Sequence, residues 1–496
     1  MQQACATLLL TALALGSLTT SCSRRTAPPL IREAFLTFDN LTGDAALDWI
    51  AQAAPQMLAH DLMGLPKTVP LNAGVIRDAY LERATRLVHG YFEMRSGKLH
   101  FEIEVEDAAG HRMIQTATED GEPLEAMNRA AKLLDPGARS FPASAAVVAL
   151  WGQGQYERAV ALDPDFALGW LDWTEQLAGS GEAPRAKEIA GQALARPTLQ
   201  SPIDRARLEL AAAALRQDSA ARLAASRKLA ELTPADPAVL GALAELEMNA
   251  RHFTDAAHAY QDLLLADPGS PDARNLLGYA QAFAGDLDGA RKTFDAYGHQ
   301  SAQAAVNALD SMGEGYFVNG KFDQAERAFL DAYGKDPAFI QGATLWKAAH
   351  ARWLAGDLPR ADKIMEQYWQ LRAKVHDPLL AWRRANWLYE TGRHDAAMEL
   401  LMHAPPEAAE VAQRQLQVWT NLASLPSDLP TLERSYRESN PVTDGLVRTL
   451  YAEALVRAGR KAEAKSLVKL WPVPEETDSP LRALIYPKFI ELRKEL

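Results

Sequence analysis

Apolar and small residues recur at helical spacing along most of the chain, most clearly between Pro271 and Pro337. Within this stretch, five positions recur 35 residues further on: Leu277, Gly278, Gly285, Ala290 and Phe294 match Met312, Gly313, Gly320, Ala325 and Phe329. A glycine and an Asp-Pro pair such as Asp336-Pro337 interrupt the helical spacing in each copy. A period in the thirties indicates stacked repeat units, and the pattern predicts two short antiparallel helices in each unit.

The small residues of the repeat predict close helix crossings. We expect Gly278 and Gly313 to face Ala290 and Ala325, because a bulky side chain there would hold the two helices of a unit apart. Gly285 is expected to end the first helix in the left-handed conformation. This order of leucine, glycine, glycine, alanine, aromatic residue and proline resembles the tetratricopeptide repeat (TPR). The resemblance implies a superhelical solenoid with a concave groove.

The alanine of the repeat marks how far the array extends. It occurs at Ala256, Ala290, Ala325, Ala361, Ala397 and Ala464. The longer gap before Ala464 predicts one degenerate helix pair around 411–437, and Gly181 with Ala186 repeats the spacing upstream. We therefore expect an all-α solenoid of about nine or ten helix pairs over residues 140–496.

The periodicity changes between residues 31 and 136. Leu99, Phe101, Ile103 and Val105 alternate with His100, Glu102, Glu104 and Glu106, which is typical of a half-buried strand with one solvated face. An amphipathic helix is expected after Gly43, with Asp44 as its cap. The elements read in order βαβαβββα, so the sequence predicts a small α/β domain before the solenoid, an α+β/α multidomain fold.

Two segments of this domain resemble a known family. Phe38-Asp39-Asn40-Leu41-Thr42-Gly43-Asp44 before an amphipathic helix, and the hairpin from His89 through Ser96-Gly97 to Asp107, are similar to the TolB-like amino-terminal domain. In many bacterial chains that domain precedes helical repeats. Ser201-Pro202-Ile203-Asp204-Arg205, inside the array, is also similar to chains with that arrangement. The kinase or winged-helix domain that often accompanies them has no counterpart in this sequence.

The first 30 residues predict export. An apolar run at 6–18 ends in small residues and is too short to span a bilayer comfortably, so residues 1–21 read as an export signal peptide. Cys22 stands where a bacterial lipoprotein signal places the cysteine that becomes acylated, followed by a flexible tether at 22–30. After cleavage no other cysteine would remain to pair with it. An ordinary cleaved signal is the alternative. We expect a lipoprotein on the periplasmic face of the envelope, attached to a membrane by its lipid.

Net charge and sequence motifs restrict the classes of function that this chain can have. The formal net charge of −12 argues against nucleic acid as a partner, because phosphate binding needs a surplus of Lys and Arg. The sequence contains neither His-Glu-x-x-His, nor Gly-x-Ser-x-Gly, nor a phosphate-binding glycine loop with lysine. We therefore expect no catalytic residue, no metal site and no cofactor.

Two groups of polar residues are candidates for a metal or acid–base site. Glu102, Glu104 and Glu106 share a strand face and could form a metal or acid–base cluster, but a solvated sheet face is the simpler interpretation. His252 and His258 are six residues apart and fall on different faces of a helix, as ordinary surface or interhelix residues do.

The concave groove is the main candidate for binding. Counting back from the repeat alanine, we expect eight side chains to project into it: Asn275, Tyr279, Glu314, Trp346, His350, Trp353, Asn386 and Tyr389. Trp and Tyr are frequent anchors of interfaces. The alternative is that Trp346 and Trp353 fill gaps between neighbouring helices.

Two functions of different class remain at this stage. The first is a non-catalytic scaffold in the cell envelope, whose groove and TolB-like domain bind protein or peptide partners. The second is a ligand sensor or enzyme, in which the α/β domain binds a small molecule and the repeats only support it. The sequence favours the first, because a solenoid presents an extended concave surface and needs no catalytic residue.

Overall fold

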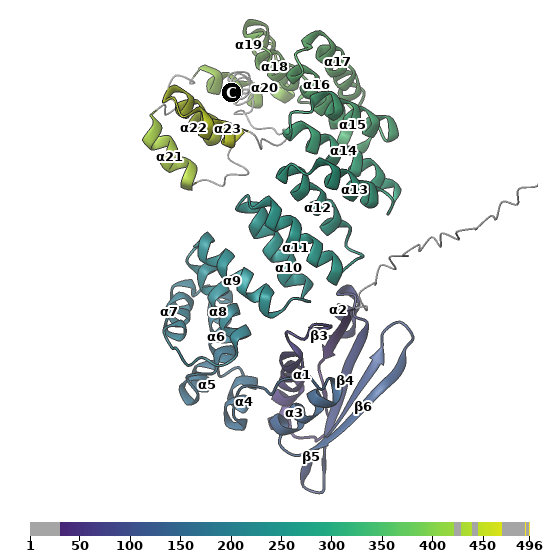
Figure 1. Ribbon diagram of the computed structural model, residues 1–496, viewed down its shortest axis with the longest axis vertical. Coiled ribbons are helices and arrows are strands. Elements are labelled where there is room, and N and C mark those ends of the chain that lie inside the picture. The colour runs from purple at the N-terminus through teal and green to yellow at the C-terminus, as the bar shows by residue number, and fades with distance from the viewer. Residues whose placement is uncertain (1–29, 421–427, 439–444, 469–491, 493–495) are drawn as a thin grey trace, which may run out of the picture.

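The computed structural model describes residues 30–420, 428–438, 445–468, 492 and 496. The expected signal peptide, Cys22 and nearly all of the tether lie outside these residues. A small sheet domain stands at one end of the molecule, and a curved stack of helices extends from it (Figure 1). None of the helices in the described ranges combines the length and the apolar character that crossing a membrane requires.

The sheet domain is a mixed sheet with helices on both faces. Its elements in chain order are β1 (Ile31–Leu36), β2 (Asp39–Asn40), η1 (Ala45–Leu47), α1 (Asp48–Leu62), β3 (Thr68–Gly74), α2 (Ile76–Leu81), β4 (Arg86–Arg95), β5 (Lys98–Asp107), β6 (Arg112–Asp120) and α3 (Pro123–Leu134). The strand order is β3-β1-β4-β5-β6, with β2 beside β4. Strand β1 is parallel to both β3 and β4, and β4, β5 and β6 are antiparallel neighbours. A sheet domain before the helices agrees with the sequence, and the two-residue strand β2 is an addition to the expected order.

The alternation in β5 decides which face of the sheet is buried. Phe101, Ile103 and Val105 are fully buried against α1 and α3, in a core that also holds Phe35 and Phe92. Asp44 accepts a hydrogen bond from the backbone N–H of Ala46, 2.9 Å away, and so caps the 3-10 turn η1 rather than α1 itself.

The solenoid begins with shorter helices and continues with regular hairpins. Its first half comprises α4 (Ala145–Gly152), α5 (Tyr156–Leu162), α6 (Ala167–Gly179), α7 (Ala183–Leu194), α8 (Pro202–Leu215), α9 (Ser219–Leu232), α10 (Pro237–Asn249), α11 (Phe253–Ala266), α12 (Pro271–Ala284) and α13 (Leu287–Gly298). Its second half comprises α14 (Ala302–Val318), α15 (Phe322–Lys335), η2 (Phe339–Gly342), α16 (Ala343–Leu354), α17 (Leu358–Lys374), α18 (Leu380–Glu390), α19 (His394–Met402), η3 (Pro406–Ala408), α20 (Ala409–Thr420), α21 (Leu429–Glu438), α22 (Gly445–Arg457) and α23 (Lys461–Val468).

The repeat alanines are buried and the repeat glycines lie at close helix contacts, as expected, but the glycines contact a different residue than expected. All six repeat alanines are completely buried. Gly285 ends α12 with a φ of 88°, in the left-handed conformation. A Cβ on Gly278 would lie 2.5 Å from the ring of Phe294, and one on Gly313 would lie 2.6 Å from the ring of Phe329. The glycines therefore accommodate the aromatic ring of the second helix, rather than its alanine, at the closest approach.

The sheet domain and the first repeats share one hydrophobic core. A single cluster of buried residues runs from Phe35 in β1 to Ala212 in α8. Within it, His60 Nε2 on α1 lies 2.7 Å from an Asp204 carboxylate oxygen on α8. A second contact joins Arg83 Nη1 to Asp267 at 2.8 Å, in the turn between α11 and α12. The domain thus contacts the solenoid from α8 to the turn between α11 and α12.

Candidate functional site

First helices of successive repeats, such as α12, α14 and α16, line the inner side of the curve (Figure 1). Side chains of these helices form a polar pocket. Its volume is about 630 Å³, within the usual range for ligand sites. Residues of α12, α14, η2, α16 and α18 line it: Tyr279, Asn307, Asp310, Glu314, Phe339, Ile340, Gln341, Ala343, Lys347 and Arg383. We call this the concave pocket. It brings together residues that are up to about three repeats apart in the sequence.

One wall of the concave pocket is an acidic centre. The ammonium of Lys347 on α16 lies 2.8 Å from Asp310 and also contacts Glu314, both on α14. Tyr279 on α12 donates its hydroxyl to Glu314 at 3.0 Å. Burial acts to lower the pKa of Lys347, but the two carboxylates outweigh it and hold that pKa above its ordinary value. The lysine therefore stays charged, and two carboxylates share a single cation.

A basic centre adjoins the concave pocket through Arg383, which lines it. Asp377 accepts hydrogen bonds from Arg372 Nε at 2.7 Å and from Arg383 Nε at 2.8 Å. Burial acts to raise the pKa of Asp377, but the hydrogen bond from Arg372 and the charge of Arg383 outweigh it and hold the pKa below its ordinary value. Arg372 also donates to the side-chain oxygen of Gln341, at 2.7 Å. Here two guanidinium groups share one carboxylate.

The turn η2, which contributes Phe339, Ile340 and Gln341 to the lining, has an unusual backbone. Ile340 and Gln341 have φ angles of 41° and 56°, and Gly342 continues in the same left-handed region. A β-branched residue such as isoleucine rarely adopts this conformation, and holding it there costs about 1–3 kcal/mol. The Ile340 side chain is exposed. The turn thus presents an apolar side chain beside the two charged centres.

Three of the eight side chains expected in the groove lie at the concave pocket or beside it. Tyr279 and Glu314 line it. Asn275 is half-buried one turn before Tyr279 and accepts a hydrogen bond from Ser311 on α14 at 3.1 Å. These contacts join α12 to α14, so the same side chains that face the groove also connect neighbouring repeats.

Three others are buried, which corrects the expectation that they face a partner. Trp346 is 4% exposed, His350 is fully buried and Asn386 is 1% exposed. His350 Nε2 lies 3.1 Å from Glu390 on α18, and its ring packs against Trp346 with the ring centroids 4.1 Å apart. The physical reason is that large side chains connect α16 to α18: the His350 ring also packs edge-to-face on Trp387, with centroids 5.1 Å apart, and counting positions within one repeat does not reveal such contacts.

Trp353 and Tyr389 are half-buried and have partners within the chain. Trp353 packs edge-to-face against Trp387, with centroids 5.5 Å apart, and also against the apolar cluster formed by α21 to α23. Tyr389 stacks on His394 at 4.3 Å. The gap-filling interpretation therefore describes both tryptophans of the expected groove.

Eight of the ten residues that line the concave pocket were not expected from the sequence, among them the charged Asp310, Lys347 and Arg383. A signal for some of them exists in the sequence. Lys347 follows Asp310 by 37 residues and Glu314 by 33, and Glu314 follows Tyr279 by 35. Side chains that can pair and are separated by about one repeat lie opposite each other on successive first helices, so complementary pairs at that offset indicate contacts across repeats.

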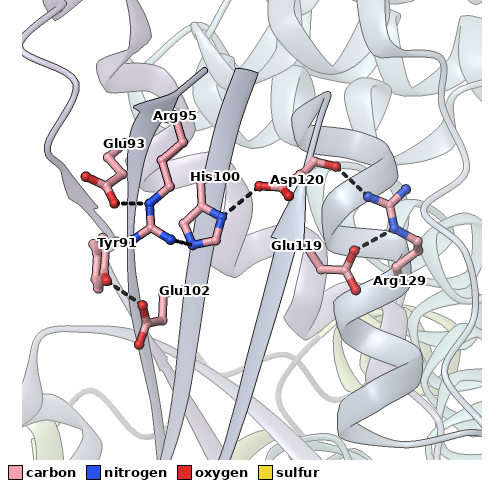
Figure 2. A network of polar contacts seen from close by, with 8 residues as sticks. All are labelled: Tyr91, Glu93, Arg95, His100, Glu102, Glu119, Asp120 and Arg129. Atoms are coloured by element: carbon pink, nitrogen blue, oxygen red, sulfur yellow. Dashed lines mark hydrogen bonds and ion pairs between the residues drawn. The ribbon is translucent and has the colours of Figure 1, made fainter. Parts of the chain in front are cut away.

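The outer face of the sheet carries a second polar network. Arg95 connects Glu93 to His100, which lies 2.7 Å from Asp120 on the edge strand (Figure 2). Tyr91 contacts Glu102 on the same face. Each carboxylate of this network already has a hydrogen-bond donor, so the arrangement cross-links β4, β5 and β6, as cross-strand pairs do.

The remaining candidates in this domain have structural partners too. His89 lies between Glu104, at 3.6 Å, and Glu106, at 3.9 Å, on the open sheet face.

A cavity at the edge of the domain, between Met63–Pro70 and Thr233–Asp236, has a volume of about 10 Å³ and has room for no more than one water molecule.

One cluster in the described residues has the composition of a metal site. Donor atoms of Glu247, His252 and Asp255 lie within 4.8 Å of one another. Arg227 already binds Glu247 through two hydrogen bonds, of 2.6 and 2.9 Å, and reaches Asp255 at 3.4 Å. A metal ion would have to displace this guanidinium, so the cluster is better described as an ion-pair network between α9, α10 and α11.

Comparison with known proteins supports the repeat. Residues 247–311 match the model of the tetratricopeptide repeat family. A tetratricopeptide repeat protein from Parabacteroides merdae is 13% identical over 68% of this chain and 99% of its own, with a TM-score of 0.33. YrrB, described as a TPR protein with an unusual peptide-binding site, is 18% identical over 37% of this chain and 94% of its own, with a TM-score of 0.31. MamA is 18% identical over 35% and 93%, with a TM-score of 0.29.

A search among curated proteins finds no match to the chain. The family match covers the end of α10 to the first half of α14, which includes Asn275, Tyr279 and Asp310 of the concave face. Repeats of this kind generally serve as scaffolds for protein or peptide interactions.

Proposed function

We propose that this chain is a non-catalytic scaffold of the cell envelope, which binds a protein or peptide partner in its concave groove. The observation that carries the proposal is the concave pocket, an opening of about 630 Å³ lined by four successive first helices and by the strained turn at Ile340. A solenoid offers such a surface without any catalytic group. Tyr279 and Glu314, which the sequence places in the groove, both line this pocket, and this supports the proposal.

A photo-crosslinking experiment tests this proposal. A photoreactive amino acid is placed at Ile340, on the rim of the concave pocket, and in a second variant at Leu265, an exposed apolar residue of α11. The chain is expressed in a bacterium that exports it and is irradiated. We expect a discrete crosslinked species from Ile340 that disappears when Arg383→Glu is added, and none from Leu265. Equal crosslinking at both sites, or no effect of Arg383→Glu, would contradict binding in the pocket.

We place the chain in the envelope on the strength of its first 30 residues. Residues 1–21 have the pattern of an export signal, and acylation of Cys22 would attach the protein to a membrane through the tether 22–30. Intact-mass spectrometry of the purified mature protein tests this. The expected product begins at Cys22 and carries the added mass of acyl chains, whereas a Cys22→Ala variant should be soluble. An unmodified mature terminus would exclude the lipid anchor.

The TolB-like assignment of the sheet domain is also part of the proposal. It rests on the resemblance at Phe38–Asp44 and in the β4–β5 hairpin, and it assigns the domain a second surface for protein partners. The alternative of a ligand sensor needs a cavity of several hundred Å³ in this domain. The small cavity at its edge does not favour that alternative.

A further inference from the structure

Helix α14 lines a second groove with residues that the concave pocket does not use. This groove has a volume of about 640 Å³, and its lining residues come from α13, α14 and α15. Helices α13 and α15 are the second helices of two successive repeats, and both pack against α14. None of the residues that line this groove also lines the concave pocket. We call it the second-helix groove.

The second-helix groove has an apolar lining that comes mainly from one face of α14. Its side chains are Ala305, Ala308, Leu309, Met312 and Tyr316 from α14, with Phe294 from α13. The five positions of α14 follow the i, i+3, i+4, i+7, i+11 spacing of a single helix face. Leu309 and Tyr316 are only half-buried, so a partner that covers them would remove further apolar surface from water.

The apolar lining favours a helical partner over an extended one. Apart from Tyr316, its side chains are those of alanine, leucine, methionine and phenylalanine, and the backbone groups inside α14 are hydrogen-bonded within the helix. An extended peptide would leave its own N–H and C=O groups against this lining without partners, which is costly. A helix satisfies its backbone internally and can present an apolar stripe. The groove therefore suits an amphipathic helix.

Two rows of ionisable side chains border the apolar lining. The rows are Arg291, Asp295 and His299 on α13, and Arg327, Asp331 and Lys335 on α15. All six side chains are exposed. Within each row the residues are four apart, which corresponds to about 6 Å along the helix axis. From its amino-terminal end, the row on α15 is basic, acidic and basic, and the row on α13 begins in the same order.

The order of the signs, rather than a net charge, is what a partner would match. Arg291 lies 3.6 Å from Asp295, but both side chains are about half exposed, and exposed pairs of this kind contribute little. A helix with acidic, basic and acidic side chains four residues apart would place opposite charges beside such a row, at the same spacing of about 6 Å. This order reads the same in both directions, so it does not fix the direction of the bound helix.

We propose that the second-helix groove docks an amphipathic helix of a partner protein. The apolar stripe of that helix covers the apolar lining, and its flanks carry acidic, basic and acidic side chains four residues apart, beside the rows of α13 and α15. The inference goes beyond the proposed function, because it uses a surface that is separate from the concave pocket.

The test uses three fluorescent, alanine-rich helical peptides. The first carries a leucine stripe flanked by Glu, Lys and Glu at four-residue spacing. The second has the same stripe with every charge exchanged, and the third has the composition of the first with its leucines distributed around the helix. Binding to the purified full chain is measured by fluorescence anisotropy. We expect the first peptide to bind about tenfold more tightly than the third, because only the first buries a continuous stripe.

The charge rows should give a smaller preference that depends on salt. At low salt we expect the first peptide to bind about fivefold more tightly than the second, because exposed charge pairs contribute little individually. In about 1 M NaCl this preference should disappear, while the preference over the third peptide should persist.

Two sets of variants locate the binding site. Leu309→Ser should weaken both stripe-bearing peptides about tenfold, because it removes apolar surface from the lining. Leu264→Ser, at a half-buried leucine of α11 outside the groove, is the matched control and should leave binding unchanged. Circular dichroism verifies that the variants retain the fold.

The second set changes only exposed residues, so it does not depend on how well the core tolerates a substitution. Arg327→Glu combined with Lys335→Glu should abolish or reverse the preference for the first peptide over the second. Lys292→Glu combined with Lys321→Glu, at exposed positions outside the groove, should keep that preference.

Three results would overturn the inference. One is equal binding of the first and third peptides, and another is binding that Leu309→Ser and the charge substitutions on α15 leave unchanged. The third is loss of binding in Arg383→Glu, which would place the peptide in the concave pocket. Unchanged binding in Arg383→Glu supports the second-helix groove even where crosslinking at Ile340 fails, so the inference and the proposed function can be rejected separately.

Discussion

Two clusters in the described part of the chain hold a buried cation between two carboxylates, and they differ in what surrounds them. At the junction of the sheet domain and the solenoid, His60 lies 2.7 Å from Asp204 and 3.6 Å from Asp61. In the concave pocket, Lys347 lies between Asp310 and Glu314. The junction is enclosed by the continuous core of the domain and the first repeats, whereas the second cluster lines an opening of about 630 Å³.

The comparison teaches that the chemistry of such a cluster does not reveal its role. In both, a cation joins carboxylates on a different helix: His60 on α1 meets Asp204 on α8, and Lys347 on α16 meets Asp310 on α14. Enclosed by apolar side chains, the cluster can only join two parts of the chain. Beside a pocket, groups of the same kind can also face a ligand. Access to the cluster therefore distinguishes a structural site from a binding site.

The junction should be the most sensitive place for a single substitution. Asp204→Ala removes the hydrogen-bonded partner of the buried His60, and breaking a buried ion pair in this way typically costs about 3–5 kcal/mol. Urea unfolding followed by tryptophan fluorescence measures the loss. Asp288→Ala, at an exposed position of α13, is the control and should change stability by less than about 0.5 kcal/mol. A small effect of Asp204→Ala would mean that apolar packing alone holds the junction.

Alkaline pH should weaken the cluster at the junction but not the cluster in the concave pocket. Burial acts to lower the pKa of His60, but the hydrogen bond to Asp204 and the second carboxylate outweigh it and raise that pKa to about 9. Because the folded-state pKa is raised, the stabilisation is complete below about pH 6.5 and is lost as the pH rises through about 9, a total of about 3 kcal/mol. The pKa of Lys347 is raised above its ordinary value, so the groove cluster stays charged over this range.

The measurement is thermal unfolding between pH 6.5 and pH 10, in the parent and in His60→Gln. The parent should lose stability progressively across this range, and the variant should lose much less of it. An identical pH dependence in the two proteins would show that another group titrates.

Packing, rather than charge, should fix the shape of the groove. Gly278 precedes Tyr279, and a Cβ at Gly278 would meet the ring of Phe294. We expect Gly278→Ala to lower the free energy of unfolding by about 1–3 kcal/mol, although alanine favours a helix. Gly334→Ala is the matched control, because that helical glycine of α15 has no atom within 4 Å of its added Cβ, and it should stabilise the protein by up to about 1 kcal/mol. The critical result is that Gly278→Ala lowers the free energy of unfolding whereas Gly334→Ala raises it.

The contact between Arg83 and Asp267 should contribute least to the stability of the folded chain. Arg83 and Asp267 form an ion pair at 2.8 Å, but the arginine side chain is 54% exposed. Exposed pairs typically contribute less than about 1 kcal/mol. A double-mutant cycle with Arg83→Gln and Asp267→Asn measures the coupling. A coupling as large as the effect of Asp204→Ala would make this contact an equal partner in the junction.

The sequence predicted the parts of the fold that depend on local periodicity. The repeat alanines, the left-handed glycines and the alternating strand β5 can be read from spacing, because each reflects a constraint within one element or one hairpin. The buried ring contacts of Gly278 and Gly313 also follow from the repeat, although their partners are phenylalanines and not alanines.

The site was predicted less completely, for a physical reason. Tyr279 and Glu314 line the pocket because the regular repeat places them on its inner face. Trp346, His350 and Asn386 occupy comparable positions but are buried, because side-chain contacts such as His350 with Glu390 and Trp387 of α18 cover this part of the inner face. The turn at Ile340, Gln341 and Gly342 has no counterpart in the repeat pattern, so the rim of the pocket could not be inferred from it.

The place of strand β1 has a mechanical consequence. The strand begins at residue 31 and lies between β3 and β4, parallel to both. A pull applied through the preceding residues acts along this strand and shears two hydrogen-bonded ladders together, instead of unzipping one bond after another from an edge. A load that arrives from the amino-terminal side therefore meets the sheet in its most resistant direction, and the helical stack beyond it can yield first.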